Sequence, residues 1–66
     1  MKREPIKEWS GRIIGWIETE SNGDKRITDF SGRILGFYKA NYDQTTDFYG
    51  RIIGRGDQLM TLLNNN

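Results

Sequence analysis

Three arginines recur in the same short sequence context and are the side chains best suited to bind a ligand. Arg12, Arg33 and Arg51 each follow an acidic residue by four positions and a glycine by one. A guanidinium group grips a phosphate or carboxylate through paired hydrogen bonds, so three of them at equivalent positions could hold a small anion. The competing interpretation is structural, because each arginine would face its own acidic residue across a turn.

Aromatic residues accompany these arginines. Rings stack on nucleobases while cations meet phosphates, so aromatic and cationic side chains together are typical of a nucleotide-binding surface. The ligand-binding residues predicted on this basis are Arg12, Arg33, Arg51, Phe30, Phe37 and Tyr49. The alternative is that the aromatics form the core or a subunit interface of a small β-protein, because they bury large apolar areas.

The sequence contains no histidine and no cysteine. It therefore lacks the usual general base, the commonest metal ligand and the thiol nucleophile, and it can form no disulfide. Serine-histidine catalysis is excluded, which leaves Asp and Glu as acid-base residues. We expect a protein that is not an enzyme and that holds no cofactor and no metal.

The arginines belong to a repeat of eight residues, in the order acid, aromatic, Ser or Tyr, Gly, Arg, Ile, Ile or Leu, Gly. It occupies residues 8–15, 29–36 and 47–54. An acid at the first position and Gly at the fourth favour a type I turn closed by a left-handed glycine. The pattern predicts three β-hairpins, in repeats near residues 6–20, 27–40 and 45–56.

The turns also predict a register, with each acid opposite its arginine. The next pairs on the same face are then Ile6 with Ile14, Ile27 with Leu35, and Thr45 with Ile53. A two-residue turn at the Ser-Gly step would instead pair the aromatic residue with the arginine.

The rest of the chain supplies the connections between the hairpins. Residues 21–24 contain Asn-Gly, a strong hairpin signal, and residues 40–43 form a longer loop. We expect strands near residues 5–9, 12–20, 25–29, 33–40, 44–48 and 51–55. The fold class predicted for the single domain 1–66 is all-β, an antiparallel meander of three repeated hairpins.

The apolar segment 57–63 differs in kind. Leu59, Leu62 and Leu63 have helical spacing, and Asp57 could cap the N-terminus of a short helix. A final strand is the alternative, because apolar residues also alternate there. In either form we expect this segment to pack on a neighbouring subunit.

Size and charge limit the partners. A chain of 66 residues buries a small core, and without disulfides or metals oligomerisation is the remaining source of stability. We expect a symmetric homo-oligomer, with a tetramer as the expected form. The net charge of +1 offers no broad basic field for duplex nucleic acid or for a membrane. Without a transmembrane stretch or a secretory signal, the sequence indicates a cytoplasmic protein.

The repeated Asp-Phe-x-Gly-Arg-Ile-x-Gly unit, with Tyr or Phe soon after it and Gly-Asp near the end, resembles the small bacterial and phage domains of the four-fold beta flower family. The resemblance extends over residues 9–63. It implies a symmetric all-β module, without an activity common to the whole family. A weaker likeness links the chain to the tyrosine-aspartate (YD) repeats of Rhs-type proteins, although the spacing here is tighter.

Two functions follow as hypotheses. The first is a homo-oligomeric binding module for a small anionic nucleotide-type ligand, which in a phage would act as a sponge for an immune signal. The second is a structural or oligomerisation module that binds no ligand.

Overall fold

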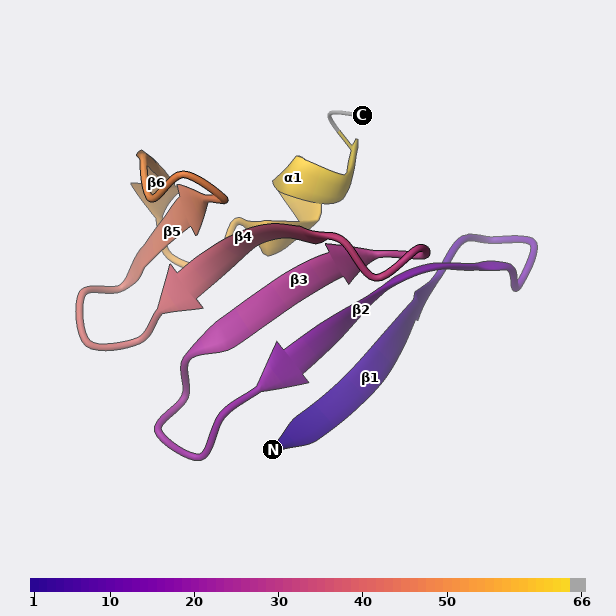
Figure 1. Ribbon diagram of the computed structural model, residues 1–66, viewed down its shortest axis with the longest axis horizontal. Coiled ribbons are helices and arrows are strands. Elements are labelled where there is room, and N and C mark those ends of the chain that lie inside the picture. Colours follow the sequence, from indigo (N-terminus) through magenta and orange to yellow (C-terminus); the bar gives the residue numbers. More distant parts are fainter. Residues whose placement is uncertain (65–66) are drawn as a thin grey trace.

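The computed structural model describes residues 1–64 and contains six strands and one helix. The elements are β1 (Lys2–Lys7), β2 (Ile13–Thr19), β3 (Lys25–Asp29), β4 (Ile34–Lys39), β5 (Gln44–Asp47), β6 (Ile52–Arg55) and α1 (Leu59–Asn64). The strands form one open sheet in the order of the sequence, and every neighbouring pair is antiparallel (Figure 1). The predicted antiparallel meander is confirmed, and the C-terminal segment is a helix.

The turns of the three hairpins share one geometry. In the second, the N–H of Gly32 donates to the carbonyl oxygen of Asp29 at 3.0 Å, and the N–H of Asp29 donates to the carbonyl oxygen of Arg33 at 3.0 Å. The φ angle of Gly32 is +92°, and those of Gly11 and Gly50 are +90° and +89°. The predicted left-handed glycine is therefore confirmed in all three turns, and the two-residue alternative is wrong.

A bulge shifts the register further along each hairpin. The observed pairs are Ile6 with Gly15, Ile27 with Gly36, and Thr45 with Gly54. The predicted partners were the residues one position earlier, so this part of the predicted register is wrong: Ile6 does not pair with Ile14, Ile27 with Leu35, or Thr45 with Ile53. The physical reason is an extra residue in the second strand of each hairpin.

The bulge decides which face of the sheet carries the aromatic residues. Side chains alternate along a strand, and residues paired across two strands share a face. With the bulge, Gly36 shares a face with Ile27, and Phe37 lies on the opposite face, paired with Arg26. We call this second surface the open face and define it by six residues: Arg3, Trp16, Glu18, Arg26, Phe37 and Lys39.

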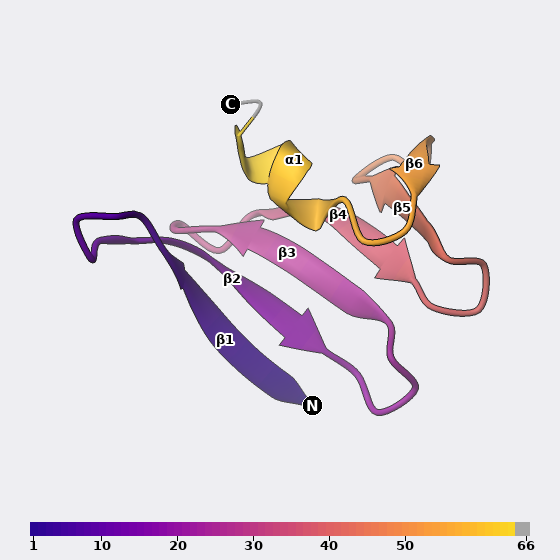
Figure 2. The same cartoon turned by 180° about the vertical axis from the view of Figure 1, so that it is seen from behind.

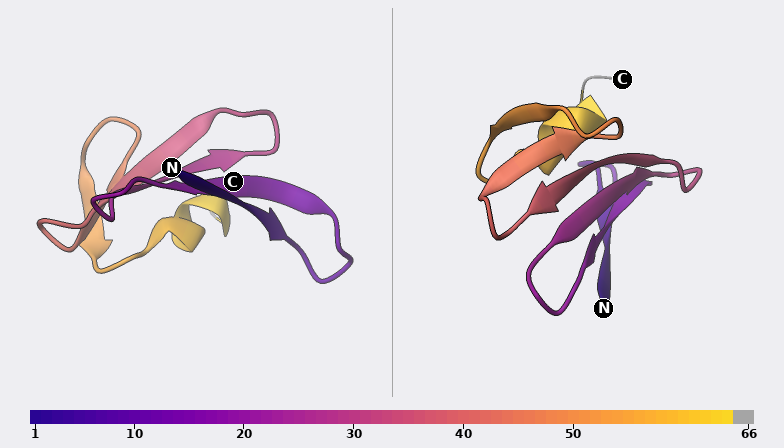
Figure 3. Two further views of the ribbon diagram at one scale, coloured as in Figure 1. Left: turned by 90° about the horizontal axis from the view of Figure 1, so that it is seen from below. Right: turned by 60° about the vertical axis from the view of Figure 1, so that its left-hand side comes forward.

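Helix α1 lies on the other side of the sheet and contacts β3 and β4 (Figures 2 and 3). Among the described residues, the buried apolar side chains are Ile27 and Leu59, both with 0% exposure. Leu62 lies directly over the backbone of Gly36. The expectation that the apolar segment needs a neighbouring subunit is wrong, because the helix packs on the sheet of its own chain.

The connection between β6 and α1 is fixed by hydrogen bonds. The hydroxyl of Thr45 is buried; it donates to the carbonyl oxygen of Gly56 at 2.6 Å and accepts from the N–H of Gln58 at 2.8 Å. The carboxylate of Asp57 accepts from the N–H of Leu59 at 3.2 Å, as predicted for a cap. The helix is thus fixed to the sheet at its first turn.

Within residues 1–64, no helix has the length and apolarity that crossing a bilayer requires.

Candidate ligand-binding site

The repeat arginines lie on the turns that join β1 to β2, β3 to β4 and β5 to β6. An antiparallel meander places these three turns at one end of the sheet. The Nε atoms of Arg12, Arg33 and Arg51 are 3.4, 3.6 and 3.1 Å from the carboxylates four residues earlier. Their side chains are 77 to 80% exposed. The predicted pairing of acid and arginine is confirmed, but each arginine stands on its own exposed turn.

The acids of the second and third turns also bind the backbone. In the second turn, Oδ1 of Asp29 accepts hydrogen bonds from the N–H groups of Ser31 at 3.0 Å and Arg33 at 2.9 Å, and from the Ser31 hydroxyl at 2.7 Å. The Ser31 hydroxyl and then the N–H of Arg33 are the largest causes that lower the pKa of Asp29. The pKa of Asp47 is likewise lowered, chiefly by the N–H of Arg51. These carboxylates therefore stabilise the turns, whereas exposed ion pairs contribute little.

The aromatic residues of the turns are exposed. Trp9 is 98% exposed, Phe30 is 72% exposed and Tyr49 is 82% exposed. The rings of Tyr49 and Phe48 form a T-shaped contact, with 5.5 Å between centroids. The interpretation of these rings as the core of this chain is wrong, because the turns carry them beyond the sheet.

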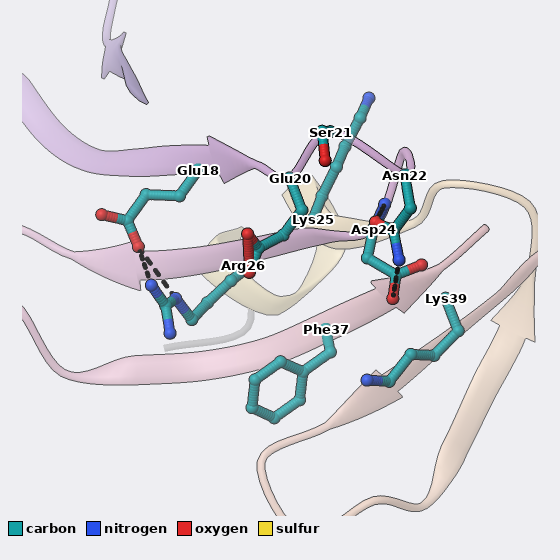
Figure 4. A pocket seen from close by; sticks show the side chains of 9 residues that line it. All are labelled: Glu18, Glu20, Ser21, Asn22, Asp24, Lys25, Arg26, Phe37 and Lys39. Carbon is teal, nitrogen blue, oxygen red and sulfur yellow. Dashed lines mark hydrogen bonds and ion pairs between the residues drawn. The ribbon is translucent and has the colours of Figure 1, made fainter. Parts of the chain in front are cut away.

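A hollow of about 430 Å³ lies on the open face, toward the opposite end of the sheet (Figure 4). It is lined by residues of β2, β3, β4 and the turn between β2 and β3: Glu18, Glu20, Ser21, Asn22, Asp24, Lys25, Arg26, Phe37 and Lys39. Phe37 is the only one of the predicted site residues that lines this hollow. The other five lie at the turns.

One cation lies over the ring of Phe37, and a second is on the neighbouring strand. The Nζ atom of Lys39 is 5.4 Å from the ring centroid, a distance at which a cation is attracted to an aromatic face. Arg26 lies directly across the strand pair from Phe37. Its Nε donates to Glu18 at 2.8 Å, and a second guanidinium nitrogen contacts the same oxygen. Lys39 pairs with no carboxylate in the described part of the chain, so its charge is available to an anion.

The far wall of the hollow is held in place by Asp24. One oxygen of its carboxylate accepts from the N–H of Ala40 at 2.8 Å, which links the turn between β2 and β3 to the loop between β4 and β5. The N–H of Asp24 donates to the Asn22 side chain at 3.0 Å. Lys25 also lines the hollow, but its ammonium pairs with Asp57 at 3.0 Å and points away from Phe37 in Figure 4. The wall is thus preformed.

Comparison with protein-family models, with curated protein sequences and with solved structures gave no significant match. Within residues 1–64, no three acidic side chains gather closely enough to hold a metal ion.

Arg26 and Lys39 line the hollow but were not among the site residues predicted from the sequence. Phe37 and Lys39 are two positions apart, so alternation alone places them on one face of a strand. Arg26 can be placed beside these two residues only when the register between β3 and β4 is known. In that register, the bulge puts Phe37 on the same face as Arg26. A search for cations at the second position after an aromatic residue would have found Lys39.

Proposed function

We propose that this protein is a non-catalytic binding module that holds a small anionic ligand with a flat ring, such as a nucleotide, in the hollow of the open face. The observation that supports the proposal is the position of Phe37 between Lys39 and Arg26 in a hollow of about 430 Å³. Small-molecule sites commonly measure about 300 to 1,000 Å³ and combine apolar surface with a few placed polar groups. A mononucleotide matches this size and chemistry.

Each part of such a ligand has a partner in the hollow. A nucleobase would stack on the ring of Phe37, as bases do on exposed aromatic side chains. A phosphate would pair with the ammonium of Lys39, which has no acidic partner among the described residues. The exposed carboxylate of Glu20 could accept hydrogen bonds from sugar hydroxyls or from a base amine. Lys39 would move from the ring to the phosphate on binding.

Self-association belongs to the proposal. Within the part of the chain that the structure describes, both edges of the sheet are unpaired and no helix lies on its open face. A homo-oligomer, with a tetramer as the expected form, would cover part of this surface and could bring the turn arginines of one copy to the hollow of another. In that assembly the predicted residues Arg12, Arg33 and Arg51 would join Phe37 around the ligand.

The test is a panel of mononucleotides and cyclic nucleotides, screened by thermal shift and measured by calorimetry. A ligand at 100 times its dissociation constant should stabilise the fold by about 2.7 kcal/mol. Phe37→Leu and Lys39→Ala should each weaken binding by about 1 to 3 kcal/mol. The matched controls, Phe30→Leu and Lys7→Ala, change exposed residues away from the hollow and should leave affinity unchanged.

Arg33→Ala separates the hollow from the turns. It should leave the affinity of the isolated chain unchanged, because Arg33 stands on a separate exposed turn. If Arg33→Ala lost affinity and Phe37→Leu did not, the binding site would lie at the turns and not in the hollow. Equal binding by Phe37→Leu, Lys39→Ala and wild type would refute the site.

A second function is favoured by a different observation. Each turn arginine already has an acidic partner. The aromatic residues of the turns are exposed in the single chain, where a second copy would cover them in an interface. These features support a structural module that associates with itself and binds no ligand. In that case no nucleotide changes the melting temperature, and Arg33→Ala lowers the stability of the oligomer.

A further inference from the structure

We infer that β6 is an edge at which two copies of this chain pair, strand to strand and antiparallel, about a twofold axis. The inference rests on the self-association proposed above and not on the ligand. The copies meet through this edge and not through the edge formed by β1.

The two edges of the sheet differ in their protection. β1 has the sequence Lys-Arg-Glu-Pro-Ile-Lys, so four of its six residues are charged and a fifth is Pro5, which has no N–H to donate. Charged residues and proline on an edge strand are the usual defence against pairing with another chain. β6 has the sequence Ile-Ile-Gly-Arg, and Ile52 and Ile53 are 61% and 42% exposed. β6 is short and bulged, but only Arg55 of its residues is charged and none is proline, so its edge is less protected by charge than that of β1.

The backbone of β6 offers hydrogen-bonding groups to a second strand. Because Asp47 donates to the carbonyl oxygen of Arg51, the next pair, Thr46 with Ile52, is not hydrogen-bonded. The N–H and C=O of Ile52 therefore point away from β5. Hydrogen-bonded and non-hydrogen-bonded pairs alternate along β5, and the pair that contains Arg55 is again not hydrogen-bonded. The N–H and C=O of Arg55 therefore also point away from β5. The Arg55 carbonyl accepts from the Gln58 side chain at 3.2 Å, which leaves it a second lone pair.

These orientations select one register. With the twofold axis between Ile53 and Gly54, Ile52 of each copy lies opposite Arg55 of the other, and the two residues exchange both backbone bonds. About four intermolecular hydrogen bonds result. Shifting the axis to Ile53 would place Arg51 opposite Arg55 of the second copy, which is unfavourable for like charges. Pairing β6 with β6 is isologous and closes, so it yields a dimer instead of a fibre.

Hydrogen exchange on the wild-type chain tests which edge pairs. We expect the amides of segment 51–56 to become more protected between about 5 and 500 µM protein, because association follows mass action, while those of β1 do not. Sedimentation over the same range should show the matching increase in mass. A chain that stays monomeric overturns both self-association and this inference. Association with new protection in β1, or without protection in 51–56, overturns only the choice of β6.

A pair of variants gives a second test. Ile52→Lys places a charge on the β6 edge and should raise the dissociation constant of the dimer by about tenfold or more. Met60→Lys makes the same change at another exposed apolar position, 44% exposed on α1, and should raise it far less. Circular dichroism at low concentration checks that both variants fold. Equal dissociation constants for the two variants would overturn the inference, and the exchange experiment stands even if Ile52→Lys fails to fold.

Discussion

Leu62 of α1 packs directly over the backbone of Gly36 in β4 and leaves no space for a side chain at that position. A methyl group on Gly36 would also overlap the carbonyl oxygen of Thr46 on the adjacent strand. Backbone on one side and the helix on the other make this contact rigid. The glycine thus allows the helix to approach the sheet of its own chain.

Gly36→Ala should therefore destabilise the fold by about 1 to 3 kcal/mol, the usual cost of overpacking a tight site. The control is Gly54→Ala, at the equivalent position of the third repeat. A Cβ there would meet only the flexible Gln58 side chain, 3.2 Å away, so a change within about 0.5 kcal/mol is expected. Urea unfolding of both variants measures the difference, and equal midpoints would show that α1 does not pack as described.

The buried hydroxyl of Thr45 gives a second prediction. Thr45→Val keeps the shape of the side chain but leaves the carbonyl of Gly56 and the N–H of Gln58 without their partner. The expected loss is about 1 to 3 kcal/mol, the cost of leaving buried polar groups unsatisfied. Thr46→Val, on the other face of the same strand, is the matched control and should be nearly neutral. Unfolding monitored by tryptophan fluorescence provides the comparison; similar stabilities would contradict the role assigned to this hydroxyl.

The turn glycines give a third prediction. Gly32 has a φ of +92° and open space around its Cα, so a substitution there is opposed by backbone strain alone. Gly32→Ala should cost about 1 kcal/mol or more. Gly32→Asn should cost less, because asparagine adopts left-handed conformations more readily. Thermal unfolding would rank the three proteins, and an alanine variant as stable as wild type would argue against the strain.

Acid should destabilise the fold through the turn aspartates. The pKa values of Asp29 and Asp47 are lowered in the folded chain from the ordinary value of 3.8, so the folded state binds fewer protons than the unfolded state as the pH falls. Their contribution is complete above the ordinary pKa and is lost as the pH falls below it, through the lowered values. Urea midpoints measured from about pH 6 to pH 2 should decline most steeply at the acid end.

The double variant Asp29→Asn with Asp47→Asn tests the assignment of this pH dependence. It should be less stable than wild type at neutral pH, because an amide oxygen is a weaker acceptor for the turn N–H groups than a carboxylate. Its stability should also change less with acid. A decline as steep as that of wild type would assign the acid sensitivity to other carboxylates.

The turns and strands of this protein could be read from the sequence because the interactions that form them are local. Asp29, Ser31, Gly32 and Arg33 complete their turn within five residues, and an acid, a glycine and an arginine recur at the matching positions of the other repeats. The left-handed glycines, the acid-arginine pairs and the cap at Asp57 depend on contacts of this range. So do the strand positions, except that β1 covers Lys2–Lys7 where residues 5–9 were expected. Sequence periodicity is sufficient for such contacts.

Tertiary structure decided the rest. A bulge recurs at the equivalent place of all three hairpins, and in the second hairpin it pairs Ile27 with Gly36 and places Phe37 on the face of Arg26. The bare backbone of Gly36 in turn admits Leu62, a residue 26 positions later in the sequence (62 − 36 = 26). A one-residue shift of register exchanges the two faces of a strand, so the placement of the hollow and of the helix depends on packing between segments far apart in the chain.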